Sequence, residues 1–174
     1  DVVDATMMSK KALRAFLKAQ IKDAKAEGVL FSIHLKATMM KISDPIIFGH
    51  TVTVFFEKVF NKHAKIISEL GIDVNNGIGE LLAKLQTLPR EQKEEITAAI
   101  QACMDEQPDL YMVNADRGVT NLHVPSDVII DASMPALIRA GGKGWGPDGR
   151  QADAKCVIPD GSYAPIYDET ITFC

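Results

Sequence analysis

Apolar and polar residues alternate between Leu30 and Lys36, and this pattern predicts a strand. The residues on one face are apolar and those on the other are polar: Phe31, Ile33 and Leu35 against Ser32, His34 and Lys36. Lys36 ends the pattern and is followed by an apolar run, so we expect its ammonium at the carboxyl end of a strand. Open α/β sheets bind ligands at that edge. The alternative is a strand-end lysine that reaches into solvent, because lysines are seldom buried.

Apolar residues recur at helical spacing in two stretches before residue 72. In the first, Ser9 can cap a helix that ends at Gly28, with an apolar face made of Leu13, Phe16, Leu17, Ile21 and Ala24. In the second, Ser43, Asp44 and Pro45 place a capping side chain and a first-turn proline before an apolar segment. Residues 52–56 also alternate as a strand would, but the charged continuation stays helical to residue 71. Length therefore favours one long helix.

Shorter elements are expected in the rest of the chain. Helical patterns cover 78–85 and 90–104, and strand patterns cover 110–114 and 119–124. The stretch 154–173 predicts a strand, a turn, a short helix and a final strand. The glycine-rich run that starts at Gly141 matches neither a Walker sequence nor a dinucleotide fingerprint, so we interpret it as a surface loop.

Composition narrows the possible classes of function. The chain has 174 residues, 47% of them hydrophobic and 24% charged, which suffices for one domain with a buried core. A net charge of -4 leaves no excess of lysine and arginine for a phosphate backbone, so nucleic acid is not expected as a partner. No apolar run approaches the thickness of a bilayer, and the first residues lack the pattern of a signal peptide. We therefore expect no membrane association.

The three cysteines point to a reducing, cytoplasmic location. Cys103, Cys156 and Cys174 are far apart and odd in number, which fits neither a disulfide framework nor a thiolate metal site. The sequence also begins without an initiator methionine and stops directly after an apparent element, DETITFC. We expect it to be a piece of a longer protein.

The segment SDVIIDASMPALIR, residues 126–139, carries two carboxylates. A helix capped by Ser126 would place Asp127 and Asp131 one turn apart on the same face, where they could ligate a hard divalent cation. The alternative is that Asp127 belongs to the cap and that the helix dipole accounts for Asp131. Pro135 removes the hydrogen bond to the Asp131 carbonyl and should bend the helix.

Two segments together resemble one enzyme family. HLKATMMKISDPIIFGH (34–50) and NLHVPSDVIIDASMPALIR (121–139) are similar to the monomeric NADP-dependent isocitrate dehydrogenases, the single-chain bacterial form. The pattern of Lys36, Met40 and Lys41 with Asp127 and Asp131 downstream is also similar to the dimeric β-decarboxylating dehydrogenases. The likeness covers all 174 residues but only an internal portion of the family's longer chain.

The resemblance implies a fold. Residues 1–174 would form a single α/β domain, a segment of the isocitrate/isopropylmalate dehydrogenase-like large domain with a mixed sheet flanked by helices. The partners implied are isocitrate and the remainder of the full-length chain.

The resemblance also implies chemistry. In the oxidative decarboxylation of isocitrate to 2-oxoglutarate and carbon dioxide, Lys36 would contact the substrate and assist removal of the 2-hydroxyl proton, and Asp131 would be one ligand of Mg²⁺ or Mn²⁺. Asp127 would be a cap or lie behind the ligand. NADP would accept the hydride, but its pocket has no counterpart here, and neither do the other metal ligands, the substrate clamp or the general-acid tyrosine. The surroundings of Tyr163 and Tyr167 do not match that acid, so we expect the isolated chain to be inactive.

A second class of function stays open on the sequence alone. The chain could be a non-catalytic α/β interaction module in which Lys36 and Asp131 serve only structure. The two classes differ in what replacement of Lys36 would change, the rate of a reaction or the stability of the fold.

Overall fold

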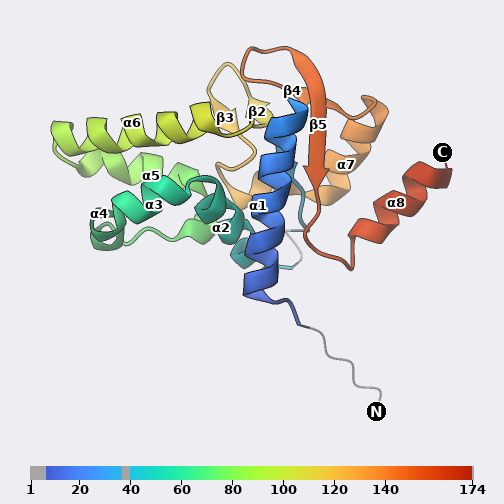
Figure 1. Ribbon diagram of the computed structural model, residues 1–174, viewed down its shortest axis with the longest axis horizontal. Helices are drawn as coiled ribbons and strands as arrows, with labels where there is room; N and C mark the ends of the chain where they lie inside the picture. The colour runs from blue at the N-terminus through green and yellow to red at the C-terminus, as the bar shows by residue number, and fades with distance from the viewer. Residues whose placement is uncertain (1–6, 37–39, 174) are drawn as a thin grey trace.

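A small mixed sheet lies at the centre of the molecule, with helices around it (Figure 1). The structure is a computed structural model that describes residues 7–36 and 40–173. Strand β1 (Leu30–Ile33) runs parallel to β5 (Gln151–Val157), and β5 pairs antiparallel with β4 (Lys143–Trp145). Strands β2 (Met112–Asn114) and β3 (Val119–Thr120) form a separate antiparallel ribbon. The α/β class and the mixed sheet are confirmed, whereas the assignment to one dehydrogenase large domain stays a prediction.

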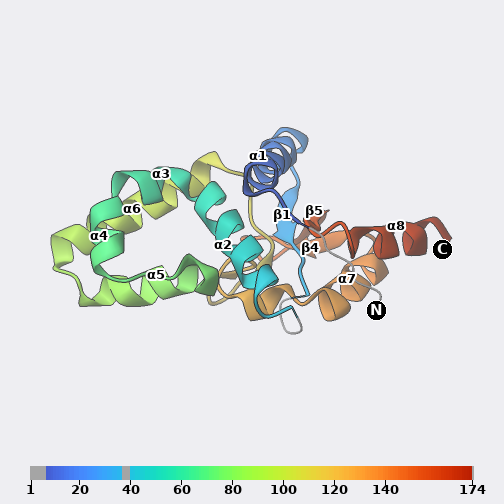
Figure 2. The same ribbon diagram turned by 90° about the horizontal axis from the view of Figure 1, so that it is seen from below.

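The helices cover both faces of this sheet. The α-helices are α1 (Lys10–Glu27), α2 (Ser43–Phe55), α3 (Glu57–Lys62), α4 (Ala64–Glu69), α5 (Ile78–Lys84), α6 (Arg90–Glu106), α7 (Ile130–Arg139) and α8 (Ala164–Phe173). Short 3₁₀ helices are η1 (Val74–Asn76), η2 (Leu85–Thr87) and η3 (Pro125–Val128). Helices α1 and α7 lie on opposite sides of the sheet, α3 to α6 gather at one end of the molecule, and α8 extends at the other (Figure 2). No helix in the described part of the chain combines the length and apolar character needed to cross a bilayer.

Helix α1 has the predicted ends. The Ser9 side chain accepts a hydrogen bond from the backbone N–H of Ala12, 3.3 Å away, and Gly28 ends the helix with a φ of 68°, which glycine adopts readily. Four of the five predicted apolar positions are buried: Leu13, Leu17, Ile21 and Ala24. The prediction was wrong for Phe16, which is 41% exposed because it lies at the edge of the buried stripe.

The polar face of β1 is as deeply buried as its apolar face. Ser32 and His34 are 0% and 1% exposed, so their side chains need partners inside the protein. The ladder ends at Ile33, earlier than the predicted Lys36, although Leu35 still bridges to Ile129. The Asn121 side chain takes the place of a neighbouring strand, since it accepts from the N–H of Ile33 at 2.7 Å and donates to its carbonyl at 3.1 Å. The loop expected just after Lys36 lies partly outside the described residues.

The long helix predicted from residue 43 to 71 is wrong, because three helices occupy this stretch. Phe56 and His63 leave the helical conformation, with φ/ψ of -100°/30° and -108°/22°. The first break lets α2 remain buried on nearly all sides while α3 turns its apolar side toward α6. Phe55 and Phe56 both stay in the core, with ring centroids 5.0 Å apart. A periodic pattern that passes through such a bend cannot by itself reveal it.

The glycine-rich run is a strand and a tight turn, not a surface loop. Its first part forms β4, and the backbone N–H of Gly146 donates to the Arg150 carbonyl at 2.8 Å to close the turn into β5. Gly149 adopts a φ of 74° there. The Asp-Gly pair at 148–149 favours a hairpin turn, but a prediction based on the pattern of apolar residues does not take it into account.

Two further predicted strands are also corrected. The strand expected over 119–124 has only two residues and then turns. The final strand is the helix α8, which follows a turn in which the Asp160 carboxylate accepts from the backbone N–H and hydroxyl of Ser162 at 2.9 and 2.6 Å. Within α8 the Thr170 hydroxyl donates to the Ile166 carbonyl at 2.6 Å, which accommodates a β-branched residue in a helix. The predicted helices 78–85 and 90–104 are confirmed to within a turn.

Candidate active site

The end of β1 is clamped to the start of α7 through the backbone. The N–H of Leu35 donates to the Val128 carbonyl, and the N–H of Ile130 donates to the Leu35 carbonyl, both at 2.8 Å. These two bonds extend the strand by one bridge beyond its ladder. They place Lys36 beside the first turn of α7, which carries Asp131.

Lys36 and Asp131 form an ion pair through Nζ and Oδ2. The pair joins residues 95 positions apart in the chain. The Lys36 side chain is only 12% exposed, so Lys36 is not a strand-end lysine that reaches into solvent. The Asp131 side chain is 53% exposed and remains accessible from outside. The structure thus brings the two predicted site residues together at an open edge of the protein.

Two tyrosines from the α8 region border this pair. The Lys36 Nζ lies 5.9 Å from the centroid of the Tyr163 ring, within the range of a cation–π interaction. The Tyr167 hydroxyl donates to the Ile130 carbonyl at 3.2 Å. Burial raises the pKa of Tyr167, and Tyr163 raises it further, so Tyr167 keeps its proton near neutral pH. Their contacts join α8 to the first turn of α7.

Asp127 does not share a helix face with Asp131, so that prediction was wrong. Asp127 lies in η3, and α7 begins only at Ile130, with Ile129 as an N-cap that makes no side-chain bond. The predicted cap from Ser126 is therefore absent. Burial raises the pKa of Asp127, and the nearby His123 lowers it. The chain straightens at Ile129 to make the bridge with Leu35, which separates the two carboxylates.

A buried hydrogen-bonded chain runs beside the ion pair. The Ser32 hydroxyl lies 2.8 Å from Nε2 of His34, and the Ser133 hydroxyl lies 2.7 Å from Nδ1 of the same ring. Burial lowers the pKa of His34 to about 4, so the ring is neutral at pH 7. Ser133 belongs to α7, two residues after Asp131. These hydrogen bonds therefore add a further link between the end of the strand and α7.

Asp44 is a buried carboxylate in the first turn of α2. It is 0% exposed, and neither oxygen has a hydrogen-bond partner among the described residues. Burial raises the pKa of Asp44, as does the charge of Asp160, while the nearby backbone N–H of Lys36 and the Ser43 hydroxyl lower it. Helix α2 begins after Ile42 without a side-chain cap, so the predicted capping role was wrong.

The whole sequence matches a known family. The sequence model described as "Monomeric isocitrate dehydrogenase" covers residues 1–174. The chain belongs to the monomeric isocitrate dehydrogenase family. The resemblance expected from the segments around Lys36 and Asp131 is thereby confirmed.

The relatives of this chain in the monomeric isocitrate dehydrogenase family are much longer proteins. Isocitrate dehydrogenase [NADP] of Azotobacter vinelandii is 56% identical over 174 residues, which is all of this chain and 24% of the relative. Isocitrate dehydrogenase [NADP] 2 of Colwellia maris is 55% identical, and the protein of that name from Mycobacterium tuberculosis is 50% identical, each over 23% of its length. The chain spans about a quarter of the length of the curated relatives it matches.

The chain does not hold a complete metal site within the described residues. No group of three His, Cys, Asp or Glu side chains over 7–36 and 40–173 is arranged to bind an ion. Asp131 offers the hard oxygen donor that Mg²⁺ or Mn²⁺ prefers, and its carboxylate is exposed enough to be reached. A single carboxylate fits one position of such a shell, so further ligands have to come from other residues.

The sequence did not reveal several residues that border the Lys36–Asp131 pair. Ser133 carries no signal in the apolar pattern, and Tyr163 approaches Lys36 from the turn before α8, far along the chain. His34 was placed on the polar face of the strand, but its partner could not be identified. The roles of Ser133 and Tyr163 become visible only from their contacts in the folded protein.

Proposed function

We propose that the chain is a segment of an NADP-dependent isocitrate dehydrogenase that supplies two groups to the active site, a catalytic lysine and a metal-ligand aspartate. The observation that carries the proposal is the contact between Lys36 and Asp131 at the carboxyl end of β1. Membership of the monomeric isocitrate dehydrogenase family supports the reaction, the oxidative decarboxylation of isocitrate with NADP.

Lys36 would act on the 2-hydroxyl of isocitrate. The Lys36 side chain is 12% exposed and its ammonium pairs with the carboxylate of Asp131, which is 53% exposed, so a substrate can approach the pair from the side of Asp131. A lysine held this way can bind the substrate hydroxyl and assist the departure of its proton as the hydride leaves. Tyr163 restricts the positions that the ammonium can take.

Asp131 would hold one position of a Mg²⁺ or Mn²⁺ shell. When bound, such a cation polarises the carbonyl that forms from the alcohol and favours loss of carbon dioxide. Asp131 can share its carboxylate between Lys36 and a cation because only Oδ2 is engaged by the lysine and half of the side chain is exposed. The other ligands and the NADP pocket would belong to the remainder of the longer chain.

The first test is the mass of the natural gene product. We expect a protein several times larger than 19.0 kDa, because the relatives are about four times as long as this chain. A natural product of 19.0 kDa would contradict the proposal, since most of the site would then be missing. In that case the non-catalytic interaction module becomes the better interpretation.

The second test uses the intact enzyme, meaning the longer chain that contains this segment. Lys36→Met should abolish isocitrate turnover with little change in melting temperature, whereas Lys41→Met, at an exposed lysine five residues later, should not. Asp131→Asn should raise the Mn²⁺ concentration needed for half-maximal rate, and Asp127→Asn serves as its matched control on η3. A Lys36→Met enzyme that melts earlier but turns over normally would assign Lys36 to structure alone.

The isolated 174-residue chain should not turn over isocitrate. One carboxylate holds Mg²⁺ weakly, and the substrate clamp lies outside this segment. The check is NADPH production by the purified chain beside its Lys36→Met variant. Turnover above that variant would mean that the segment contains a whole site.

A further inference from the structure

Three consecutive residues at the end of β1 each contact the start of α7. His34 meets the Ser133 hydroxyl at 2.7 Å, the Leu35 carbonyl accepts from the N–H of Ile130 at 2.8 Å, and Lys36 pairs with Asp131. The last contact joins the two proposed active-site groups, and the middle one is a backbone bond that any sequence could make. The first depends on two particular side chains that the proposed reaction does not use.

We infer that His34 and Ser133 are positioning residues, which set the distance between Lys36 and Asp131 by tying the strand end to the first turn of α7. This inference rests on the proposed function of Lys36 and Asp131. Successive side chains alternate along an extended chain, so His34 and Lys36 project to the same side and meet α7 together. Ser133 and Asp131 stand within one turn of α7, so a shift of that turn moves both.

The buried ring of His34 is fixed at both nitrogens. Ser32 holds Nε2 and Ser133 holds Nδ1, and His34 is 1% exposed, so the ring can neither turn nor exchange a partner for water. A neutral imidazole donates from one nitrogen and accepts at the other. One hydroxyl therefore accepts from the ring while the other donates to it. Burial keeps the ring in this neutral form at the pH where the enzyme would work.

The two serines form a natural pair of probes. Each loses one hydroxyl–imidazole bond when changed to alanine, but only Ser133 lies on α7, because Ser32 is on the same strand as His34. A general need for buried hydrogen bonds would make the two changes equivalent. A positioning role predicts a larger effect on the reaction for Ser133.

The test compares four variants of the intact enzyme: Ser133→Ala, Ser133→Thr, Ser32→Ala and Lys36→Met. We expect Ser133→Ala to lower kcat roughly 10- to 100-fold, as is usual when a group that orients an active-site residue is lost. Ser133→Thr keeps the hydroxyl and should recover most of that loss. Ser32→Ala should change kcat only about threefold, because Ser32 bonds to His34 within the strand and makes no link between Lys36 and Asp131.

Amide hydrogen exchange gives a readout that does not depend on turnover. The N–H of Ile130 is bonded to the Leu35 carbonyl, so its protection reports whether the strand end and α7 stay together. Ser133→Ala should speed its exchange, whereas Ser32→Ala should not.

The outcomes distinguish failure of the positioning role from failure of the proposed function. Equal losses of kcat for the two alanine variants, an unchanged kcat for Ser133→Ala, or a Ser133→Ala protein that does not fold would each overturn the positioning role. If Lys36→Met keeps full turnover, the proposed function fails instead, whatever Ser133 does. Loss of turnover in Lys36→Met with a normal Ser133→Ala enzyme would leave the proposed function standing and remove only this inference.

Discussion

His34 is neutral because it is buried, not because it lacks partners. Both of its neighbours are hydroxyls, and a hydroxyl oxygen can accept a hydrogen bond from either ring nitrogen, so a protonated ring would still be paired. What opposes its charge is the loss of water around a side chain that is 1% exposed. Its pKa is accordingly lowered from 6.5 to about 4.

Acid should therefore destabilise the protein through His34. Between pH 6.5 and about 4 the unfolded chain binds a proton at this ring and the folded chain does not. The contribution of His34 to the unfolding free energy is therefore fully present above pH 6.5 and is lost as the pH drops toward 4. The difference between 6.5 and about 4 corresponds to roughly 3 kcal/mol of unfolding free energy. The measurement is the melting temperature across this pH range.

The control for this prediction is His34→Gln. Glutamine can still bond to hydroxyl groups but does not titrate, so its melting temperature should depend less on pH in the same range. His50 and His123, whose pKa values burial also lowers, are present in both proteins and cancel in the comparison. Parallel pH curves for the two proteins would show that His34 does not titrate as described.

At the scale of single residues, the sequence revealed the two charged residues of the candidate site but not the residues that contact them. Lys36 stands out because a lysine ends an apolar strand, and Asp131 stands out through the family resemblance. Ser133 meets His34, and Tyr163 meets Lys36, only in the folded chain. Asp127 was misplaced because the bridge between Leu35 and Ile129 delays the start of α7.

Helices and strands were predictable where local chemistry sets their ends. Ser9 and Gly28 mark both ends of α1 because a cap and a left-handed residue act within one turn. The breaks at Phe56 and His63 were not predictable, because apolar residues recur at helical spacing on both sides of each break. Strand β4 was hidden by the glycines in and beside it, which lower strand propensity but allow close packing.

Gly144 in β4 illustrates what that close packing requires. A Cβ placed there would lie 2.3 Å from Cδ2 of the Tyr111 ring, far inside van der Waals contact. We therefore expect Gly144→Ala to displace the ring or the strand and to lower the unfolding free energy by roughly 1–3 kcal/mol. Thermal or denaturant unfolding measures this loss.

Gly161→Ala is the matched control for this change. A Cβ at Gly161 meets nothing within 4 Å, and its backbone is not left-handed. That variant should have unchanged or slightly higher stability, since alanine restricts the unfolded chain. Similar losses at both glycines would show that contact with Tyr111 is not the cause.

At the scale of the whole molecule, the end of strand β1 positions the Lys36–Asp131 pair, and the surrounding helices leave Asp131 exposed. Strand β1 is covered by α1 on one side, and the chain just after it bridges to Ile129 before α7, while α3 to α6 form a lobe at the opposite end of the molecule from α8 (Figure 1). The α/β class could be predicted because alternation and helical spacing are local. The residues that would complete the proposed metal shell could not be predicted, because the described residues contain no group of three ligating side chains.

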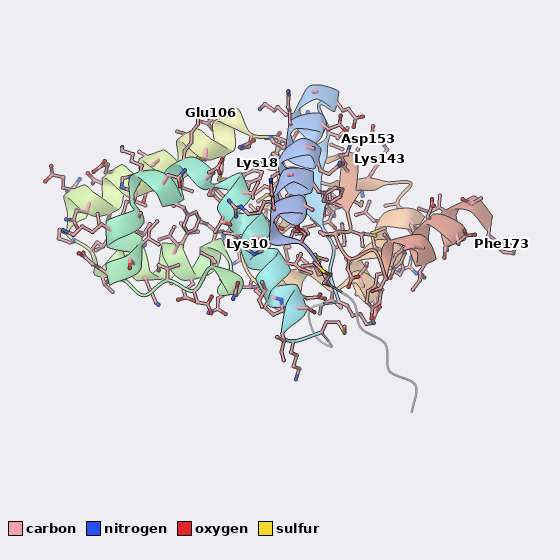
Figure 3. All side chains as sticks on the ribbon, turned by 60° about the horizontal axis from the view of Figure 1, so that its bottom comes forward. Lys10, Lys18, Glu106, Lys143, Asp153 and Phe173 are labelled. Carbon is pink, nitrogen blue, oxygen red and sulfur yellow. The ribbon has the colours of Figure 1, made fainter. Side chains whose placement is uncertain are left out.

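Helix α8 is poorly covered by the rest of the molecule. None of its residues is buried, and Ile166, Ile171 and Phe173 are 55%, 56% and 93% exposed. Ile166 and Phe173 are seven residues apart, which places them on the same face, and Phe173 projects from the tip of the helix (Figure 3). A groove of about 550 Å³ between α8, α7 and β5 is lined mainly by apolar side chains, among them Met134, Leu137 and Ile171.

Exposed apolar surface of this kind predicts that the isolated chain self-associates through α8. Contact between two copies would remove Ile166 and Phe173 from water, and each fully buried side chain of this size contributes about 1.5–3 kcal/mol. Sedimentation velocity should show species heavier than 19.0 kDa that dissociate in the double variant Ile166→Glu/Phe173→Glu. Trp145→Glu changes an apolar residue on β4 with a comparable exposure of 48% and should leave the association intact. A wild-type chain that sediments as a monomer at tens of micromolar would contradict the prediction, and equal dissociation by Trp145→Glu would place the contact on the sheet instead of α8.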